Sequence, residues 1–336
     1  MSSASTFQLS AARYGKSNVR VFRVARETPA NATSPNSDPA GVSASARGPV
    51  HHVAEFNVNA HLEGDIAKSY TEADNSVVVA TDSIKNTCYI LSKTSPHATS
   101  PTLYALHVGL HFVNKYDHIH KSVIALEQLR WSRIDVRGEA HKHAFVRDGD
   151  EKRTVEIEVD ASAGVDHVTA KITAGYRDLL VLKSSGSAFE GFIRDEYTTL
   201  TEVSDRIFST AIDLSYTFAP PSASKHLVPL TIDKLSALDA EYEFDKVAES
   251  ARRVTLEVFA EDESASVQAT LYKAAQRLLE VNGWVASVTY RLPNRHYVPV
   301  NLAFAGLENM HPPEQAEVFC LLDAPSGYIS ATVTRT

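Results

Sequence analysis

The chain has 336 residues. A single hydrophobic core usually organises fewer residues than this, so two domains of ordinary size are expected. Hydrophobic residues make up 43% and charged residues 22%, which is typical of a globular protein in water. The formal net charge of -8 argues against nucleic acid or an anionic membrane surface as the main partner.

The first predicted elements are two strands, at residues 18–24 and 51–62. Between them, residues 26–48 are rich in Ala, Ser, Pro and Asn and contain almost no large apolar residue. Such a segment cannot bury enough apolar surface to order itself. It is predicted to be a loop insertion at the tip of a hairpin.

Two helices are predicted next, at residues 84–93 and 102–116. The first follows Thr81-Asp82-Ser83, residue types that favour a helix N-cap. The second has apolar residues at helical spacing, namely Leu103, Leu106, Leu110 and Val113. Strands are expected around 122–134 and 143–147. The charged, turn-forming segment 148–152 then predicts a domain boundary.

The second half repeats this order of elements. Its predicted helices span about 244–261 and 265–280. Its predicted strands are 154–160, 168–176, 212–218, 284–292, 297–304 and 328–333. The shared order predicts an α+β chain with two copies of one unit, residues 1–150 and 151–336. Each unit would be an antiparallel sheet with helices on one face. Its open edge strands favour joining other sheets in an oligomeric β-barrel.

Only missing sequence features bear on the cellular compartment of the protein. Two cysteines, Cys88 and Cys320, are too few for a disulfide framework, which favours a reducing compartment. No apolar run approaches the roughly 20 residues that span a bilayer, and residues 1–10 lack the order of a secretory signal. The chain ends in Thr334-Arg335-Thr336, which is not a peroxisomal tripeptide of the Ser-Lys-Leu type.

Common catalytic motifs are missing from the sequence. It has no glycine-rich phosphate loop, no paired-cysteine zinc spacing, no His-Glu-x-x-His helix and no serine-hydrolase elbow. Histidine pairs occur, of which His107 and His111 are spaced to share a helix face. Without a third ligand such a pair indicates a solvated or interface surface better than a metal site. No metal site is therefore predicted.

Four segments, in order along nearly the whole chain, carry a family resemblance. The first is Ala12-Arg13-Tyr14-Gly15-Lys16, and the second is residues 75–87, with Thr81 and Asp82. The third is residues 189–200, Phe-Glu-Gly-Phe-Ile-Arg-Asp-Glu-Tyr-Thr-Thr-Leu, followed by Asp205-Arg206. The fourth pairs residues 264–270 with residues 292–297. Together these segments resemble the urate oxidase (uricase) family of fungal type.

The resemblance implies the tunnelling fold, with two such units per chain, and a homotetramer whose sites lie between subunits. It implies oxidation of urate by O2 and water to 5-hydroxyisourate and hydrogen peroxide, with no metal or organic cofactor. It also implies a peroxisomal location, although the missing tripeptide leaves a cytoplasmic enzyme open.

Site residues follow from the same resemblance. Lys16 and Thr81 match the catalytic dyad, and His296 matches the histidine that completes its proton relay. Asn294 matches the residue that, with the threonine, holds oxygen or water above the substrate. The remaining matches bind the purine: Arg206 and Gln268 at opposite edges, Phe189 beneath the ring, and Val267 and Asp82 through backbone groups.

The chemistry gives a reason for these residue types. Urate is a planar, electron-rich anion, so an arginine fork can donate two parallel hydrogen bonds and neutralise its charge. A glutamine amide offers the donor and the acceptor that a purine edge presents, and a phenyl ring fixes the plane. Removing a further proton makes urate a reductant strong enough to pass an electron to O2.

Two alternatives remain open at this point. One is another purine- or pterin-binding enzyme of the same fold, such as a cyclohydrolase or an aldolase. The other is an inactive paralogue kept as a purine-binding or structural oligomer. Taken singly, each predicted site residue has a plainer interpretation, as a surface lysine, a helix cap, a core aromatic or a turn. Their joint occurrence favours the enzyme.

Overall fold

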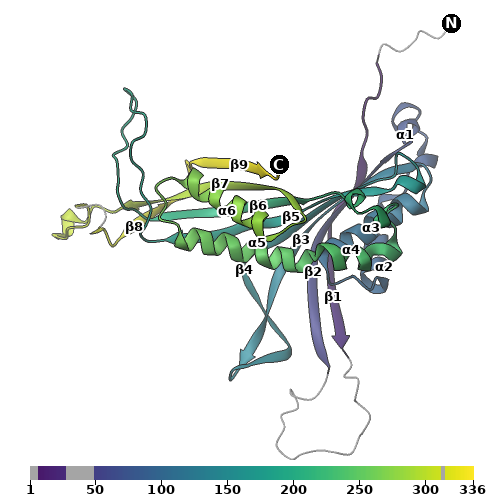
Figure 1. The fold of residues 1–336 in the computed structure, drawn as a ribbon, viewed down its shortest axis with the longest axis horizontal. Helices are drawn as coiled ribbons and strands as arrows, with labels where there is room; N and C mark the ends of the chain where they lie inside the picture. The colour runs from purple at the N-terminus through teal and green to yellow at the C-terminus, as the bar shows by residue number, and fades with distance from the viewer. Residues whose placement is uncertain (1–6, 28–48, 312–314) are drawn as a thin grey trace, which may run out of the picture. The chain divides into compact units, whose positions relative to one another are not determined.

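The computed structural model describes residues 7–27, 49–311 and 315–336 (Figure 1). Its internal contacts divide the chain into two units. The first comprises residues 1–173 and 220–243, and the second comprises residues 174–219 and 244–336. The predicted insertion at 26–48 lies outside the described residues from position 28 onward. Arg26 and Glu27 are not part of a loop, because they end the first strand, paired with His51 and Val50.

An antiparallel sheet and the helices packed on it form the first unit. Its strands, in order across the sheet, are β1 (Tyr14–Glu27), β2 (Val50–Gly64), β3 (Ile119–Val136) and β4 (Glu139–Asp160). Its main helices are α1 (Ala67–Thr71), α2 (Thr81–Thr94) and α3 (Pro101–Lys115). Residues 220–243, which contain α4 (Leu235–Tyr242), also belong to this unit.

The core of the first unit follows the predicted periodicities. Alternate residues of β2 are buried, from Phe56 through Val58 and Ala60 to Leu62, as expected where one face of a strand meets helices. The apolar residues predicted to share a face of α3 are all buried as well. The α+β class and the antiparallel sheet with helices are therefore confirmed.

Residue 150, at which the sequence predicts a domain boundary, lies inside β4. The turn-forming residues produce a bulge instead: Leu129 pairs with Lys152 and Trp131 with Arg147, so residues 148–151 face a single residue of β3. Gly149 takes a positive φ of 72° there, which costs glycine little. Arg130 holds the bulge through ion pairs with Glu151 at 2.6 Å and Asp148 at 3.3 Å.

The second unit also consists of antiparallel strands and helices. Its strands are β5 (Thr169–Lys183, within this unit from residue 174), β6 (Phe208–Phe218), β7 (Val285–Pro299), β8 (Phe319–Leu322) and β9 (Tyr328–Thr334). β7 pairs antiparallel with β6, β8 and β9. Two amphipathic helices, α5 (Phe244–Glu261) and α6 (Val267–Val281), bury one face each.

One long strand replaces two predicted ones in this unit. The expected strands at 284–292 and 297–304 are joined in β7, which runs through Pro293 and ends at Pro299. The first part of β7 pairs with β9, and its last residues pair with β8. Proline is tolerated in a strand where its missing N–H is not needed by the ladder. The strand therefore carries residues 294–296 without interruption.

No helix in residues 7–27, 49–311 and 315–336 is long and apolar enough to cross a membrane. Both cysteines are free, Cys88 in the core and Cys320 at the surface.

Candidate active site

Lys16 lies on β1, directly before an irregularity of the strand. The register with β2 shifts between Lys16 and Val19, and Asn18 takes a positive φ of 58°. Gly15 allows the close approach of the two strands here, because a Cβ at this position would meet the carbonyl oxygen of Ala60 at 2.0 Å. The strand thus holds the half-buried Lys16 at a fixed place beside β2.

Thr81 and Asp82 are the first two residues of α2, and both are exposed. The residues predicted to cap the helix, 81–83, lie within it; Ala80 occupies the N-cap position and makes no side-chain hydrogen bond to the helix. The Asp82 carboxylate accepts hydrogen bonds from Lys85 at 2.6 Å and from Asn86 at 2.9 Å. These contacts, first the one from Lys85, lower the pKa of Asp82.

The structure brings Lys16 close to the start of α2. Its positive charge is among the influences that lower the pKa of Asp82, after the stronger contacts with Lys85. A direct tether also joins the two segments, since the backbone N–H of Val79 donates to the Tyr14 hydroxyl at 2.7 Å. The predicted residues of the first unit therefore lie together.

In the second unit, Phe189 and Arg206 lie side by side. The Arg206 guanidinium carbon is 5.1 Å from the centre of the Phe189 ring, and Phe189 also stacks on Phe192 with centres 4.7 Å apart. Burial lowers the pKa of Arg206. In the described part of the chain its buried Nε has no hydrogen-bond partner. A buried donor without a partner costs stability, and an anionic ligand would satisfy it.

Asp205 holds the segment that precedes Phe189. Its carboxylate accepts hydrogen bonds from the Ser185 hydroxyl at 2.6 Å, the Gly186 N–H at 2.7 Å and the Ser187 N–H at 3.4 Å. The Arg206 N–H in turn donates to the Ser187 carbonyl at 2.8 Å. These bonds, first the one from Ser185, lower the pKa of Asp205. Arg206 and Phe189 are thereby held on one small framework.

The same framework reaches α6, whose first two residues are Val267 and Gln268. Ser264 donates from its N–H to the Gly186 carbonyl at 2.9 Å and accepts from the Ala188 N–H at 2.8 Å. Ser266 caps α6, and its hydroxyl donates to the Gln268 amide oxygen at 3.0 Å. Val267 is buried while Gln268 is exposed, so the amide of Gln268 is available to a ligand.

Asn294 and His296 are two positions apart on β7, so their side chains point to the same face of the strand. The Asn294 N–H donates to the Gly327 carbonyl at 2.8 Å. Its side-chain oxygen is buried and has no hydrogen-bond partner among the described residues. His296 is exposed and pairs with Leu322 of β8.

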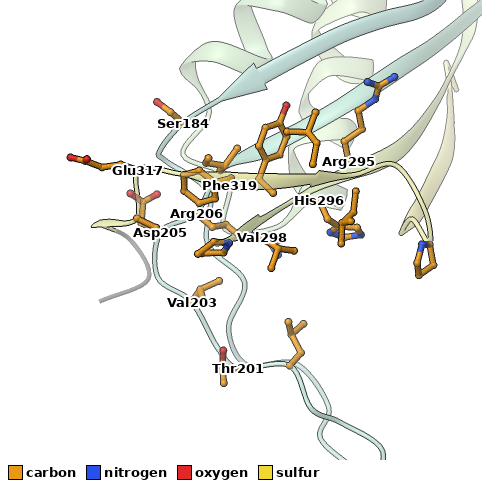
Figure 2. Close-up of a pocket in the computed structure, with 18 residues that line it drawn as sticks. Ser184, Thr201, Val203, Asp205, Arg206, Arg295, His296, Val298, Glu317 and Phe319 are labelled. Atoms are coloured by element: carbon orange, nitrogen blue, oxygen red, sulfur yellow. The ribbon is translucent and has the colours of Figure 1, made fainter. Parts of the chain in front are cut away.

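A cavity of about 930 Å³ lies in the second unit, and Figure 2 shows Arg206 and His296 among the residues that line it. This volume is at the upper end of the usual ~300–1,000 Å³ for small-molecule pockets. The sequence analysis did not single out most of its wall, which includes Val298, Phe319 and Leu321. These residues resemble ordinary core positions in the sequence, and no motif distinguishes them.

The predicted residues thus form two groups. Lys16, Thr81 and Asp82 belong to the first unit, and the other six belong to the second. Within residues 7–27, 49–311 and 315–336, no three His, Cys, Asp or Glu side chains are grouped so that they could hold a metal ion. The polar atoms available to a ligand are instead a guanidinium, two amides and a histidine.

Comparison with known proteins identifies the family. The sequence model of the Uricase family matches residues 12–158 and 172–330. The chain is 42% identical to the uricase of Emericella nidulans, over 97% of each chain, and 42% identical to that of Aspergillus flavus, over 97% of this chain and 96% of the other. The crystal structure of the uricase from Arthrobacter globiformis, 32% identical, superposes with a TM-score of 0.76 over 98% of this chain and 96% of the other. The chain belongs to the uricase family.

Proposed function

We propose that the chain is a urate oxidase, which converts urate, O2 and water to 5-hydroxyisourate and hydrogen peroxide. Urate loses two electrons and O2 gains them, and the oxygen of water becomes the hydroxyl group at C5. The observation that carries the proposal is the pairing of Arg206 with Phe189, within a chain that matches uricases over nearly its full length. A guanidinium beside an aromatic ring suits a planar anion.

Substrate recognition is assigned to the second unit. Arg206 would donate two parallel hydrogen bonds to one edge of urate and balance its negative charge. Gln268 would pair with the opposite edge, and Phe189 would stack on the ring. Val267, and Asp82 of the first unit, would contribute backbone groups. The unpaired Nε of Arg206 and the exposed Gln268 side chain support this assignment.

Proton transfer is assigned to Lys16, Thr81 and His296. A neutral lysine amine would accept a proton of urate through the threonine hydroxyl, and His296 would complete the relay. Asn294 and Thr81 would hold O2 or water above the plane of urate. The unpaired side-chain oxygen of Asn294 is available for such a contact. Electrons then pass from the deprotonated urate to O2 without a metal or an organic cofactor.

Replacing Asp205 with alanine should raise the KM for urate about tenfold, because the framework that holds Arg206 and Phe189 loses its common acceptor. One or two lost hydrogen bonds of this kind correspond to about tenfold. Asp205→Asn, which keeps one acceptor oxygen, should give a smaller rise. The matched control is Asp160→Ala in the first unit, where the carboxylate likewise accepts a backbone N–H, from Ser162 at 2.8 Å. Steady-state kinetics on the three variants decide the point, and equal KM values for Asp205→Ala and Asp160→Ala would refute it.

We also propose a homotetramer in which each site combines the first unit of one subunit with the second unit of another. The division of the predicted residues between the units supports this arrangement. Specific activity should then fall when the protein is diluted below the assembly constant. Mass photometry on the same samples reports their oligomeric state. Constant specific activity in samples shown to be monomeric would contradict a shared site.

We propose a peroxisomal location as well, by relationship to uricases of fungi.

The test of the function uses the purified protein, urate and air. Urate's ultraviolet absorbance should fall, with hydrogen peroxide formed, and both changes should stop under argon. Binding of urate with no turnover would instead favour a purine-binding protein. Loss of activity with a chelator would favour metal-dependent chemistry.

A further inference from the structure

Tyr14 joins the two chain segments that carry Lys16 and Thr81. Tyr14 lies two residues before Lys16 on β1, and its hydroxyl oxygen accepts the Val79 N–H at 2.7 Å. Val79 lies two residues before Thr81 and is only 7% exposed. The hydrogen bond therefore connects positions 65 residues apart in the sequence, immediately ahead of both members of the proposed dyad.

Such a tether matters because the dyad is divided between two elements. A proton passes between an amine and a hydroxyl only when the heavy atoms approach to about 2.6–3.2 Å. Lys16 is on a strand, and Thr81 is the first residue of a helix. The N-cap of α2 is Ala80, which makes no side-chain hydrogen bond to the helix. With no side-chain cap there, contacts from outside the helix contribute to holding the start of α2, and the bond from Val79 to Tyr14 is one of them.

The anchor of the tether is itself firmly held. Tyr14 pairs with Leu62 of β2, and Gly15 packs closely on the Ala60 carbonyl. Burial of the phenol raises the pKa of Tyr14, so the hydroxyl stays protonated near neutral pH. The uncharged hydroxyl oxygen accepts the Val79 N–H.

We propose that Tyr14 is a positioning residue for urate oxidation, whose hydroxyl sets the distance between Lys16 and Thr81 by fixing Val79. The inference rests on the proposed function, because it assumes that these two residues exchange a proton. In this role Tyr14 contacts neither substrate nor oxygen and acts only on the geometry of the dyad.

The test deletes one atom, in Tyr14→Phe. We expect kcat for urate to fall about tenfold, since misplacing a catalytic group by even about 1 Å can cost 10²-fold. The KM for urate should stay within about twofold, because the residues assigned to binding the purine edges and plane lie in the second unit. The pH at half-maximal kcat should shift, because that pH reports the proton affinity of the relay. A loss of stability alone would not produce this shift.

Tyr104→Phe is the matched control. The Tyr104 hydroxyl donates to the Cys88 carbonyl at 2.7 Å, so this variant also deletes a tyrosine oxygen that contacts the backbone of α2. Its Tm should fall while kcat and the pH profile stay unchanged. If Tyr14→Phe does not fold, 4-methylphenylalanine at position 14 fills the same volume without an acceptor oxygen.

Three outcomes decide the inference. A wild-type kcat and pH profile in Tyr14→Phe, with Lys16→Met inactive, overturns the role of Tyr14 and leaves the proposed function intact. Equal losses of kcat in Tyr14→Phe and Tyr104→Phe, with an unchanged pH profile, also overturn it. Full activity in Lys16→Met would mean that the dyad assignment has failed.

Discussion

Lys16→Met should lower kcat for urate about 10²–10⁴-fold, the range in which a general base contributes to enzymatic rates. The methionine side chain is similar in length and cannot accept a proton, so the change removes the chemistry and preserves most of the packing. Lys16 is half-buried beside β2. Binding of urate should be much less affected, because recognition of its edges is assigned to the second unit.

The measurement is single-turnover kinetics, which separates binding from chemistry. Lys93→Met, in the last turn of α2 and exposed, is the control for loss of a lysine charge nearby. Its kcat should equal that of the wild type. Turnover by Lys16→Met at the rate of Lys93→Met would show that Lys16 is not the base.

Arg206→Ala should raise the KM for urate about 10²-fold or more. Two charge-assisted hydrogen bonds of ~1.5 kcal/mol each amount to about 3 kcal/mol, and about 1.4 kcal/mol corresponds to tenfold. Arg206→Lys should recover only part of this loss, since an ammonium cannot form the parallel pair. Phe189 would remain to stack on the purine, so some binding should persist.

The control for Arg206 is Arg253→Ala in the same unit. Arg253 forms an exposed ion pair with Glu257 at 3.0 Å on α5, and its removal should leave the KM unchanged. The affinity for xanthine, a related planar purine, can be measured by calorimetry without turnover. An Arg206→Ala protein with wild-type affinity for xanthine and wild-type KM for urate would be incompatible with the proposed clamp.

The sequence predicts those elements best whose residues form one dominant pattern. The leucines of α3 recur at helical spacing and are buried as expected. β2 alternates along its buried half, because one face of the strand meets the helices. Burial of apolar side chains is the strongest local determinant of such elements.

The predicted elements differ from the observed ones where contacts between distant residues override the local sequence pattern. Asp148-Gly149-Asp150 has the composition of a turn, yet pairing on both sides and ion pairs from Arg130 make it a bulge within β4. Similarly, the two strands expected at 284–292 and 297–304 form the single strand β7, whose pairing with β9 extends to Pro293. Both depend on partners distant in the sequence, which a local pattern does not contain.

The residue types of the site were available from the sequence, but their geometry was not. The resemblance placed Arg206 and Phe189 in one site, whereas only the structure gives their separation of 5.1 Å and the hydrogen bonds of Asp205 to the segment before Phe189. Tyr14 lies within a matched segment, yet nothing in the sequence indicates its hydrogen bond to Val79. Such bonds join positions whose distance in the chain conceals their contact.

In the proposed reaction bound urate itself reduces O2, and protein residues move only protons. The decisive measurement is of the O2 consumed and the hydrogen peroxide formed per urate, in protein whose metal content per subunit is determined by mass spectrometry. We expect one O2 and one peroxide for each urate, at full specific activity in preparations with far less than one metal per subunit. Specific activity that rises and falls with the metal content would show that a metal takes part.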